Sequence, residues 1–174
     1  MATAKGTAEK LVEIALAEVG TIEGPKENET KYGKAMKANF APWCGSFVNW
    51  CAIQAGVKIP NTVYTPGGAK AFIDNKAWQY AEKATPQPGD IVYFDFPNDG
   101  VDRISHVGIV VKDNGDGTVT TVEGNTASDK KGDQRNGGEC CLKVRAYKKK
   151  NGSKLRKSQA VSVVGFGRPE FKTI

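Results

Sequence analysis

The pattern of apolar and polar residues changes about halfway along the chain. In the first half, apolar residues recur every three or four positions, as on one face of an α-helix. This spacing predicts an amphipathic helix within residues 1–20, a short helix over Tyr32–Asn39, a buried helix over Gly45–Ala55 and a helix from Gly67 or Gly68 to Lys76. We expect Gly20 and Gly56 to end the first and the third of these helices.

Beyond the turn Pro88-Gly89-Asp90, the apolar runs become short and rich in β-branched residues. They predict strands over Ile91–Phe96, His106–Val111, Thr118–Glu123, Leu142–Tyr147 and Ala160–Phe166. We expect residues 113–117 to close a hairpin rather than to bind calcium, because no Glu stands at the twelfth position of that loop. Helices followed by an antiparallel sheet indicate an α+β fold, and the length fits one domain, residues 1–174 with a core over about residues 8–171.

The positive charge of the chain is concentrated in one window. The sequence has 25 basic and 19 acidic residues, a formal charge of +6. Eight of the basic residues and no acidic residue lie within residues 143–157, which leaves 17 basic against 19 acidic residues elsewhere. This indicates a slightly acidic body with one basic loop between the last two strands, unlike a uniformly basic protein that binds nucleic acid.

The chain ends and the cysteines exclude other classes of protein. No stretch approaches the roughly 20 consecutive apolar residues of a membrane span. Glu9, Glu13 and Glu18 interrupt the segment where a signal peptide would have its apolar core. Four cysteines and one histidine show no zinc-site spacing, so we expect reduced thiols, no metal and no cofactor.

A cysteine at the start of the third predicted helix is the first candidate for catalysis. Cys44 follows Pro42-Trp43, where the free N–H groups and the dipole of the helix stabilise a thiolate. The alternative is a small residue packed on a buried face, as we expect for Cys51. A cysteine nucleophile needs a base, and His106, the only histidine, opens a strand where its side chain can face a cleft.

Further candidates follow from the predicted hairpin. If residues 113–117 close it, Glu123 and Asn125 return alongside His106, and residues two apart face the same way on an extended chain. Either group can then orient the imidazole, unless both belong to a solvated hairpin end. Trp43 adjoins the candidate nucleophile, so it is a candidate for substrate binding or a core residue.

Four ordered blocks resemble the signature of CHAP domains, the cysteine, histidine-dependent amidohydrolases/peptidases of the papain-like superfamily. The blocks are residues 42–51, 88–92, 106–110 and 122–126, and residues 164–169 are similar to the closing strand of CHAP-type phage endolysins. The resemblance implies helices packed on a central antiparallel sheet. It also implies Cys44 as nucleophile, His106 as general base, Glu123 as the group that orients it and Asn125 as a further polar member. Some CHAP enzymes have a calcium site in an Asp-rich segment just before the nucleophile, and we do not carry that site over, because residues 27–43 lack aspartate.

The resemblance implies an enzyme that cleaves an amide bond of peptidoglycan, as an endopeptidase or an N-acetylmuramoyl-L-alanine amidase. A phage endolysin without a separate wall-binding domain would be a monomer held in the host cytoplasm until its release to the wall. The basic loop over residues 143–157 would contact anionic envelope polymers, unless it is only a solvated tip. A secreted antibacterial amidase and an inactive wall-binding or virion module are the alternatives. DNA binding comes last, because no helix-turn-helix or finger accompanies the basic loop.

Overall fold

The helices that the sequence predicts occupy the first half of the computed structural model, which describes residues 3–96, 103–129, 132–148 and 163–173. They are α1 (Ala8–Ala17), α2 (Lys31–Ala35), α3 (Cys44–Ala55) and α4 (Thr65–Asp74). Thr7 and Thr30 begin α1 and α2, because each side-chain oxygen accepts a hydrogen bond from an N–H of the first turn. Gly56 ends α3 as predicted, in a left-handed conformation that glycine adopts at little cost.

Six strands form one antiparallel sheet in the order β1-β6-β2-β3-β4-β5. They are β1 (Trp78–Tyr80), β2 (Ile91–Phe94), β3 (His106–Asp113), β4 (Thr118–Thr126), β5 (Glu139–Ala146) and β6 (Val163–Gly167), with a 3₁₀ turn η1 (Ala81–Lys83) after β1. The pattern does not predict β1, because three residues carry too little alternation to be recognised. The predicted α+β class is confirmed; residues 160–162 of the last predicted strand lie outside the described residues.

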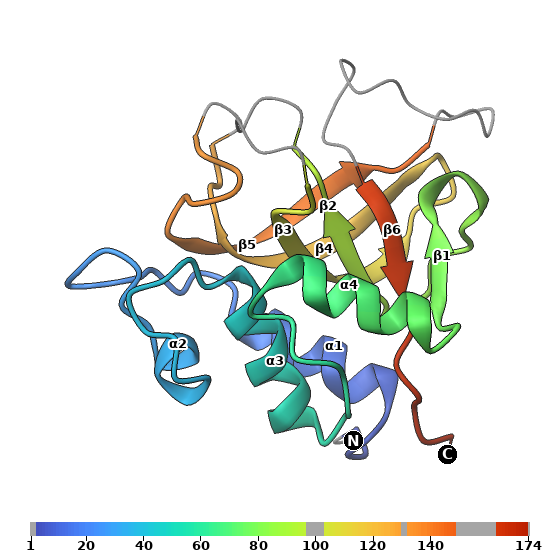
Figure 1. Ribbon diagram of the computed structural model, residues 1–174, viewed down its shortest axis with the longest axis horizontal. Coiled ribbons are helices and arrows are strands. Elements are labelled where there is room, and N and C mark those ends of the chain that lie inside the picture. Colours follow the sequence, from blue (N-terminus) through green and yellow to red (C-terminus); the bar gives the residue numbers. More distant parts are fainter. Residues whose placement is uncertain (1–2, 97–102, 130–131, 149–162, 174) are drawn as a thin grey trace.

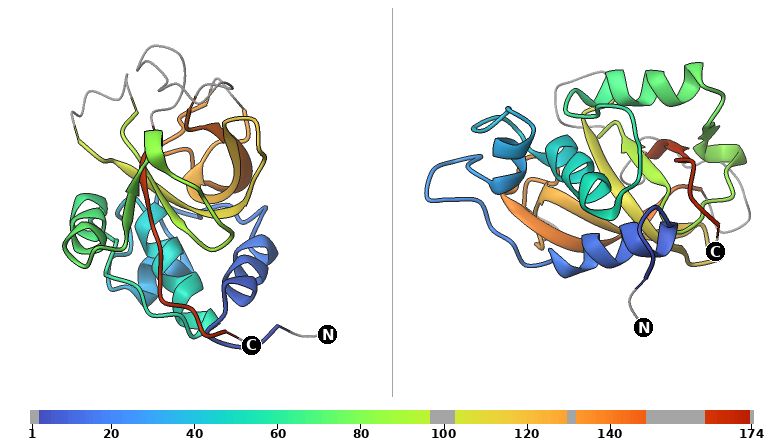
Figure 2. Two further views of the ribbon diagram at one scale, coloured as in Figure 1. Left: turned by 90° about the vertical axis from the view of Figure 1, so that its right-hand side faces the viewer. Right: turned by 90° about the horizontal axis from the view of Figure 1, so that it is seen from below.

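Helices α1, α2 and α3 lie together below the sheet, and α4 lies beside β1 and β6 (Figures 1 and 2). Alternate side chains of β2 point to opposite faces of the sheet, and each face has its own hydrophobic core. Ile91 and Tyr93 pack with the helices, whereas Val92 and Phe94 pack into a second core on the other face, where Phe166 of β6 also lies. The sheet curves around this second core (Figure 2). Because β2 is buried on both faces, its sequence is apolar throughout.

An ion pair joins the turn before β2 to the residue after β6. The Asp90 carboxylate accepts two hydrogen bonds from Arg168, from Nε to Oδ1 and from Nη2 to Oδ2, each of 2.9 Å. Oδ2 also accepts the backbone N–H of Gln87 at 2.8 Å. Asp90 is buried, whereas the Arg168 side chain is 38% exposed. The pair lies at the end of β2 opposite to Phe94, whose partner on β3 is His106.

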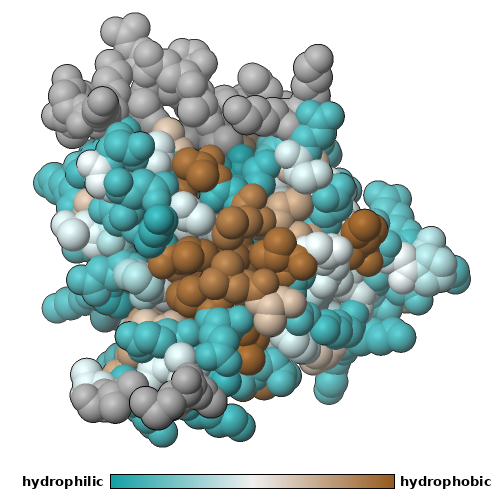
Figure 3. Space-filling model, turned by 180° about the vertical axis from the view of Figure 1, so that it is seen from behind, coloured by the Kyte–Doolittle hydropathy of each residue, from teal (hydrophilic) through white to brown (hydrophobic). Residues whose placement is uncertain are grey.

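Two apolar faces are only partly covered. Leu16 near the end of α1 is 40% exposed, although the predicted amphipathic face includes it, and Leu142 and Val144 of β5 are 52% and 65% exposed. Apolar side chains gather on the face opposite to that of Figure 1 (Figure 3). Within the ranges that the structure describes, no helix is long and apolar enough to cross a bilayer.

Candidate active site

The candidate nucleophile lies at the first position of α3. The residue before it, Trp43, makes no side-chain capping bond, and the N–H of Phe47 is the one that bonds to the Trp43 carbonyl. The N–H groups of Cys44 and Gly45 therefore have no intrahelical partner, and their partial positive charge favours a negative charge at this helix end. The Cys44 side chain is almost completely buried, with 4% exposure.

A close approach between two backbone segments fixes the start of α3. A Cβ atom on Gly45 would lie 1.9 Å from the carbonyl oxygen of Thr62, so this position admits only glycine. Asn49, one turn along the helix, holds the same segment: its Oδ1 accepts the N–H of Thr62 at 2.8 Å and its Nδ2 donates to the Pro60 carbonyl at 3.2 Å. Gly45 and Asn49 thus position the helix that carries Cys44.

His106 begins β3 and is fully buried, tilted against the rings of Phe94 and Phe96 at 5.5 and 5.3 Å. Its Nε2 lies 2.8 Å from Glu123 Oε1, while Nδ1 makes no hydrogen bond with the described residues. Burial alone would lower the pKa of His106, but the Cys44 thiol and the Glu123 carboxylate outweigh burial and raise it to about 9. The imidazole therefore bonds to Glu123 on one side and has Cys44 near enough to raise its pKa.

Glu123 on β4 is fully buried and every contact favours its ionised form. Its Oε2 accepts a 2.6 Å hydrogen bond from the Thr121 hydroxyl. Burial alone would raise the pKa of Glu123, but the guanidinium of Arg145 and the imidazole hold it well below its usual range. Gly108 on the neighbouring β3 makes room for this side chain, because a Cβ atom there would lie 2.7 Å from Glu123 Cγ.

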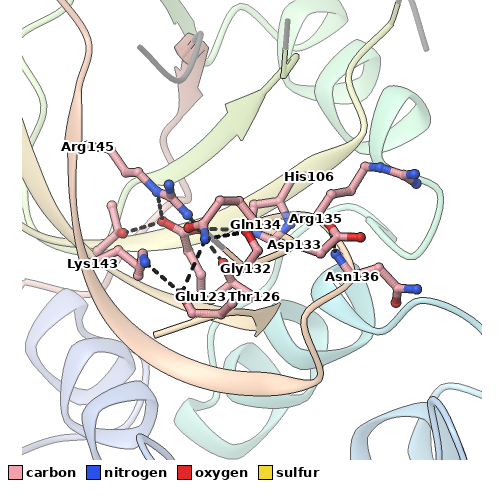
Figure 4. A network of polar contacts seen from close by, with 12 residues as sticks. His106, Glu123, Thr126, Gly132, Asp133, Gln134, Arg135, Asn136, Lys143 and Arg145 are labelled. Carbon is pink, nitrogen blue, oxygen red and sulfur yellow. Dashed lines mark hydrogen bonds and ion pairs between the residues drawn. The ribbon is translucent and has the colours of Figure 1, made fainter. Parts of the chain in front are cut away.

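The site has a further charged member that the sequence does not predict, Arg145 of β5. Its Nε donates to Glu123 Oε2 at 2.8 Å and its Nη2 to Oε1 at 2.6 Å (Figure 4). The side chain is only 4% exposed, and the guanidinium lies 5.6 Å from the ring centres of both Phe94 and Phe96. Arg145 lies in the strand predicted over Leu142–Tyr147 as well as in the basic window, and the structure places it in β5, which ends at Ala146.

Asn125 is buried, but it does not extend the line from Cys44 to Glu123. Its φ of 56° breaks the extended chain that the prediction assumed, so it does not share the direction of Glu123. Its Nδ2 donates to Asn136 Oδ1 at 2.8 Å, and its Oδ1 accepts the N–H of Gly138 at 3.0 Å. Asn125 thus anchors the loop that leads to β5 (Figure 4 shows part of this loop).

The indole of Trp43 lies in the core and not in a groove. It is fully buried and stacks on Tyr32 at 5.5 Å. Its Nε1 donates to Glu23 Oε1 at 2.9 Å. The buried, stacked and hydrogen-bonded indole agrees with the core alternative.

The basic window divides into two parts with different surroundings. Lys143 and Arg145 belong to β5, where Lys143 Nζ donates to the carbonyl of Ala127 at 2.7 Å. Residues 149–157 lie outside the described residues, so the contact with envelope polymers stays a prediction. Among the residues that the structure describes, no group of three or more His, Cys, Asp and Glu side chains is placed to hold a metal ion.

Together these groups can make and use a nucleophile. Cys44 supplies a thiol at a positive helix end, and the neighbouring imidazole can take its proton. Glu123 fixes the far side of the imidazole, as the third member of a catalytic triad does. This set of groups suits attack on a carbonyl carbon followed by proton transfer to a leaving group.

Comparison with known proteins identifies the fold and the family. The family model described as the CHAP domain matches residues 36–125, just over half of the chain. The crystal structure of Ly7917 superposes with a TM-score of 0.50 at 17% identity, over 94% of this chain and 62% of that one. The structure of NlpC1 from Trichomonas vaginalis gives 0.49 at 15% identity, over 92% and 43%. The chain thus spans less than two thirds of either protein, and a search of curated proteins found no match.

Proposed function

Because the chain belongs to the CHAP domain family, we propose that it hydrolyses an amide bond of bacterial peptidoglycan through Cys44, His106 and Glu123. The family comprises cysteine- and histidine-dependent amidohydrolases and peptidases. The observation that carries the proposal is a fully buried imidazole, hydrogen-bonded at 2.8 Å to the buried Glu123 carboxylate, with Cys44 at the start of α3 near enough to raise the pKa of His106. A catalytically inactive wall-binding module would have no need of this arrangement.

The reaction follows from the position of each group. Cys44 gives its proton to His106, and its sulfur attacks the amide carbonyl carbon to form a tetrahedral oxyanion. The backbone N–H of Cys44, free at the start of α3, donates to that oxyanion. His106 then protonates the leaving amine as the C–N bond breaks. A water molecule, deprotonated by His106, hydrolyses the thioester and restores the thiol.

The biological setting belongs to the same proposal. A phage endolysin that waits in the host cytoplasm and then degrades the wall agrees with the resemblance of residues 164–169 to the closing strand of such enzymes. A secreted antibacterial amidase would use the same chemistry. The genes beside this one, for a membrane-permeabilising protein or for an immunity protein, discriminate between the two.

The experiment is lysis of purified cell walls by the wild type, Cys44→Ala and His106→Ala. We expect both variants to fold and to lose more than about 1,000-fold in rate, because each removes a member of the nucleophile–base pair. Cys51→Ala, on the same helix but packed in the core, is the matched control and should keep its activity. Mass spectrometry of the released muropeptides identifies the bond. If Cys44→Ala or His106→Ala lysed walls at the rate of the wild type, the proposal would be overturned.

A further inference from the structure

The guanidinium of Arg145 is a buried charge whose partner is also a member of the candidate site. Both carboxylate oxygens of Glu123 accept a hydrogen bond from it, and Thr126 Oγ1 accepts a third at 3.3 Å. A guanidinium and a carboxylate in this paired geometry fix each other's plane as well as their distance. Arg145 thus determines the direction in which Oε1 faces the imidazole.

Burial makes the charge of Glu123 depend on this partner. A fully buried carboxyl without a counter-charge takes up a proton, because a low-dielectric interior disfavours the ion. Within the described ranges, the ionisable groups that interact with Glu123 are His106 on β3, Arg145 on β5 and the thiols of Cys140 and Cys141, also on β5. Arg145 is the one permanent cation among them, since histidine titrates and thiols carry no positive charge.

The state of Glu123 decides which nitrogen of His106 carries the proton. An ionised Glu123 can only accept, so Nε2 must donate to it and the neutral ring keeps its lone pair on Nδ1. A protonated Glu123 would instead donate to Nε2. The proton of the neutral ring would then be on Nδ1, and the ring could not take the proton of Cys44.

We propose that Arg145 is a positioning residue: by holding Glu123 as a carboxylate, it keeps the proton of His106 on Nε2 and leaves Nδ1 free to accept from Cys44. The effect on catalysis rests on the proposed function, but the effect on the imidazole does not. Arg145 acts through Glu123 and touches neither the nucleophile nor the substrate in this scheme.

The test uses the single histidine of the chain. With ¹⁵N-labelled histidine, the NMR spectrum of the full chain contains one imidazole, and the shifts of its two nitrogens report which is protonated. In the wild type we expect Nε2 to stay protonated from pH 6 to 10 while Nδ1 loses its proton. In Arg145→Met we expect the shared proton to move to Glu123, so that neutral pH gives a ring protonated on Nδ1 alone.

Two matched variants separate this role from general effects of charge and packing. Lys143→Met removes a cation from the same face of the same strand and should leave the spectrum unchanged. Arg145→Lys keeps a positive charge and should keep Nε2 protonated. If Arg145→Met does not fold, Arg145→Gln, which retains a donor without charge, takes its place. The proposal would be overturned if Nε2 of His106 stayed protonated up to pH 10 in Arg145→Met or Arg145→Gln, as it does in the wild type.

Wall hydrolysis provides an independent readout. We expect Arg145→Met to lower kcat about 100-fold with little change in KM, since substrate contacts are untouched and general acid–base catalysis is impaired. A wild type that shows the expected spectrum but does not hydrolyse walls would overturn the proposed function alone. Hydrolysis by the wild type together with an unchanged imidazole in the neutral variant would overturn the role of Arg145 alone.

Discussion

Two arginine–carboxylate pairs lie on different strands of the sheet, one beside β2 and β6 and the other on β4 and β5, and they differ in what else the carboxylate holds. Asp90 uses its remaining capacity on the backbone N–H of Gln87, so its pair with Arg168 ties the start of β2 to the end of β6. Glu123 uses its remaining capacity on an imidazole and a hydroxyl. The same pair of functional groups is therefore structural beside β2 and β6 and belongs to the candidate active site on β4 and β5.

Burial separates the two pairs as well. Arg168 is 38% exposed and can be hydrated if its partner is lost, whereas Arg145 is 4% exposed and cannot. A cation left alone in the interior destabilises a protein far more than one that reaches water. Asp90, Arg168 and Glu123 lie in blocks that resemble the CHAP signature, whereas Arg145 lies in none of them, so the three-dimensional contacts are needed to recognise the second pair.

Neutralising each carboxylate in turn tests whether the two pairs have different roles, and it has the largest expected effect. Glu123→Gln should lower the rate of wall hydrolysis about 100-fold or more, because the imidazole loses the charge that orients it. Asp90→Asn should leave that rate within about threefold and instead lower the free energy of unfolding by about 1–3 kcal/mol. Wall lysis and denaturant titration of both variants measure the two effects. A rate loss in Asp90→Asn equal to that in Glu123→Gln would contradict the division of roles.

A second change acts on Glu123 without touching its charge. In Gly108→Ala the new Cβ atom must displace Glu123 Cγ, which lies 2.7 Å from its position, so we expect about a tenfold loss of activity and a loss of stability of about 1–3 kcal/mol. Gly67→Ala is the control, because its nearest contact is an ordinary 3.5 Å and its stability should change by less than about 1 kcal/mol. Full activity of Gly108→Ala would show that the site tolerates a displaced carboxylate.

The smallest expected effect is the pH dependence of stability. The pKa of His106 is raised to about 9, so between its unfolded value of about 6.5 and pH 9 the native state binds more protons than the unfolded state. The contribution of His106 is thus complete below about pH 6.5 and is lost as the pH rises through 9. Denaturant titrations at pH 6.5 and 8 should show this decline in the wild type and in Asp90→Asn, since the buried thiols of Cys51, Cys140 and Cys141, whose pKa values are also raised, add a decline of their own mainly above about pH 8.5. The decline should be much weaker in His106→Gln; an equal decline there would contradict the assignment.

Much of the fold could be predicted, because α3 and the central strands are buried along faces that repeat at helical or strand spacing. The elements that the sequence pattern does not predict are short or irregular, such as β1 with its three residues. The contacts of Asn125 could not be predicted for another reason: it lies within β4, but its positive φ coincides with a shift in the pairing of β4 with β5 between Glu123 and Thr126. A hydrophobic pattern carries no information on one such dihedral angle.

The site shows the same limit. The positions of Cys44, His106 and Glu123 could be predicted from a helix start, a strand start and a hairpin. Arg145 could not, because β5 reverses the usual rule: Val144 is 65% exposed, and Arg145, in the next position, is 4% exposed. The sequence shows the alternation of side chains along β5. It does not show that the buried side of this strand holds an arginine, because the partner of that arginine, Glu123, lies on another strand.

The two ends of the described chain meet far from this chemistry. The N–H of Lys172 donates to the carbonyl of Gly6 at 2.8 Å, and Phe171 packs near Gly89, at the Asp90 end of β2. Partners fused to either end would therefore project from the side away from Cys44 and His106. For the same reason the ends suit a short peptide bridge, and new ends opened in the exposed hairpin at Gly115 would give a circularly permuted enzyme with its site intact.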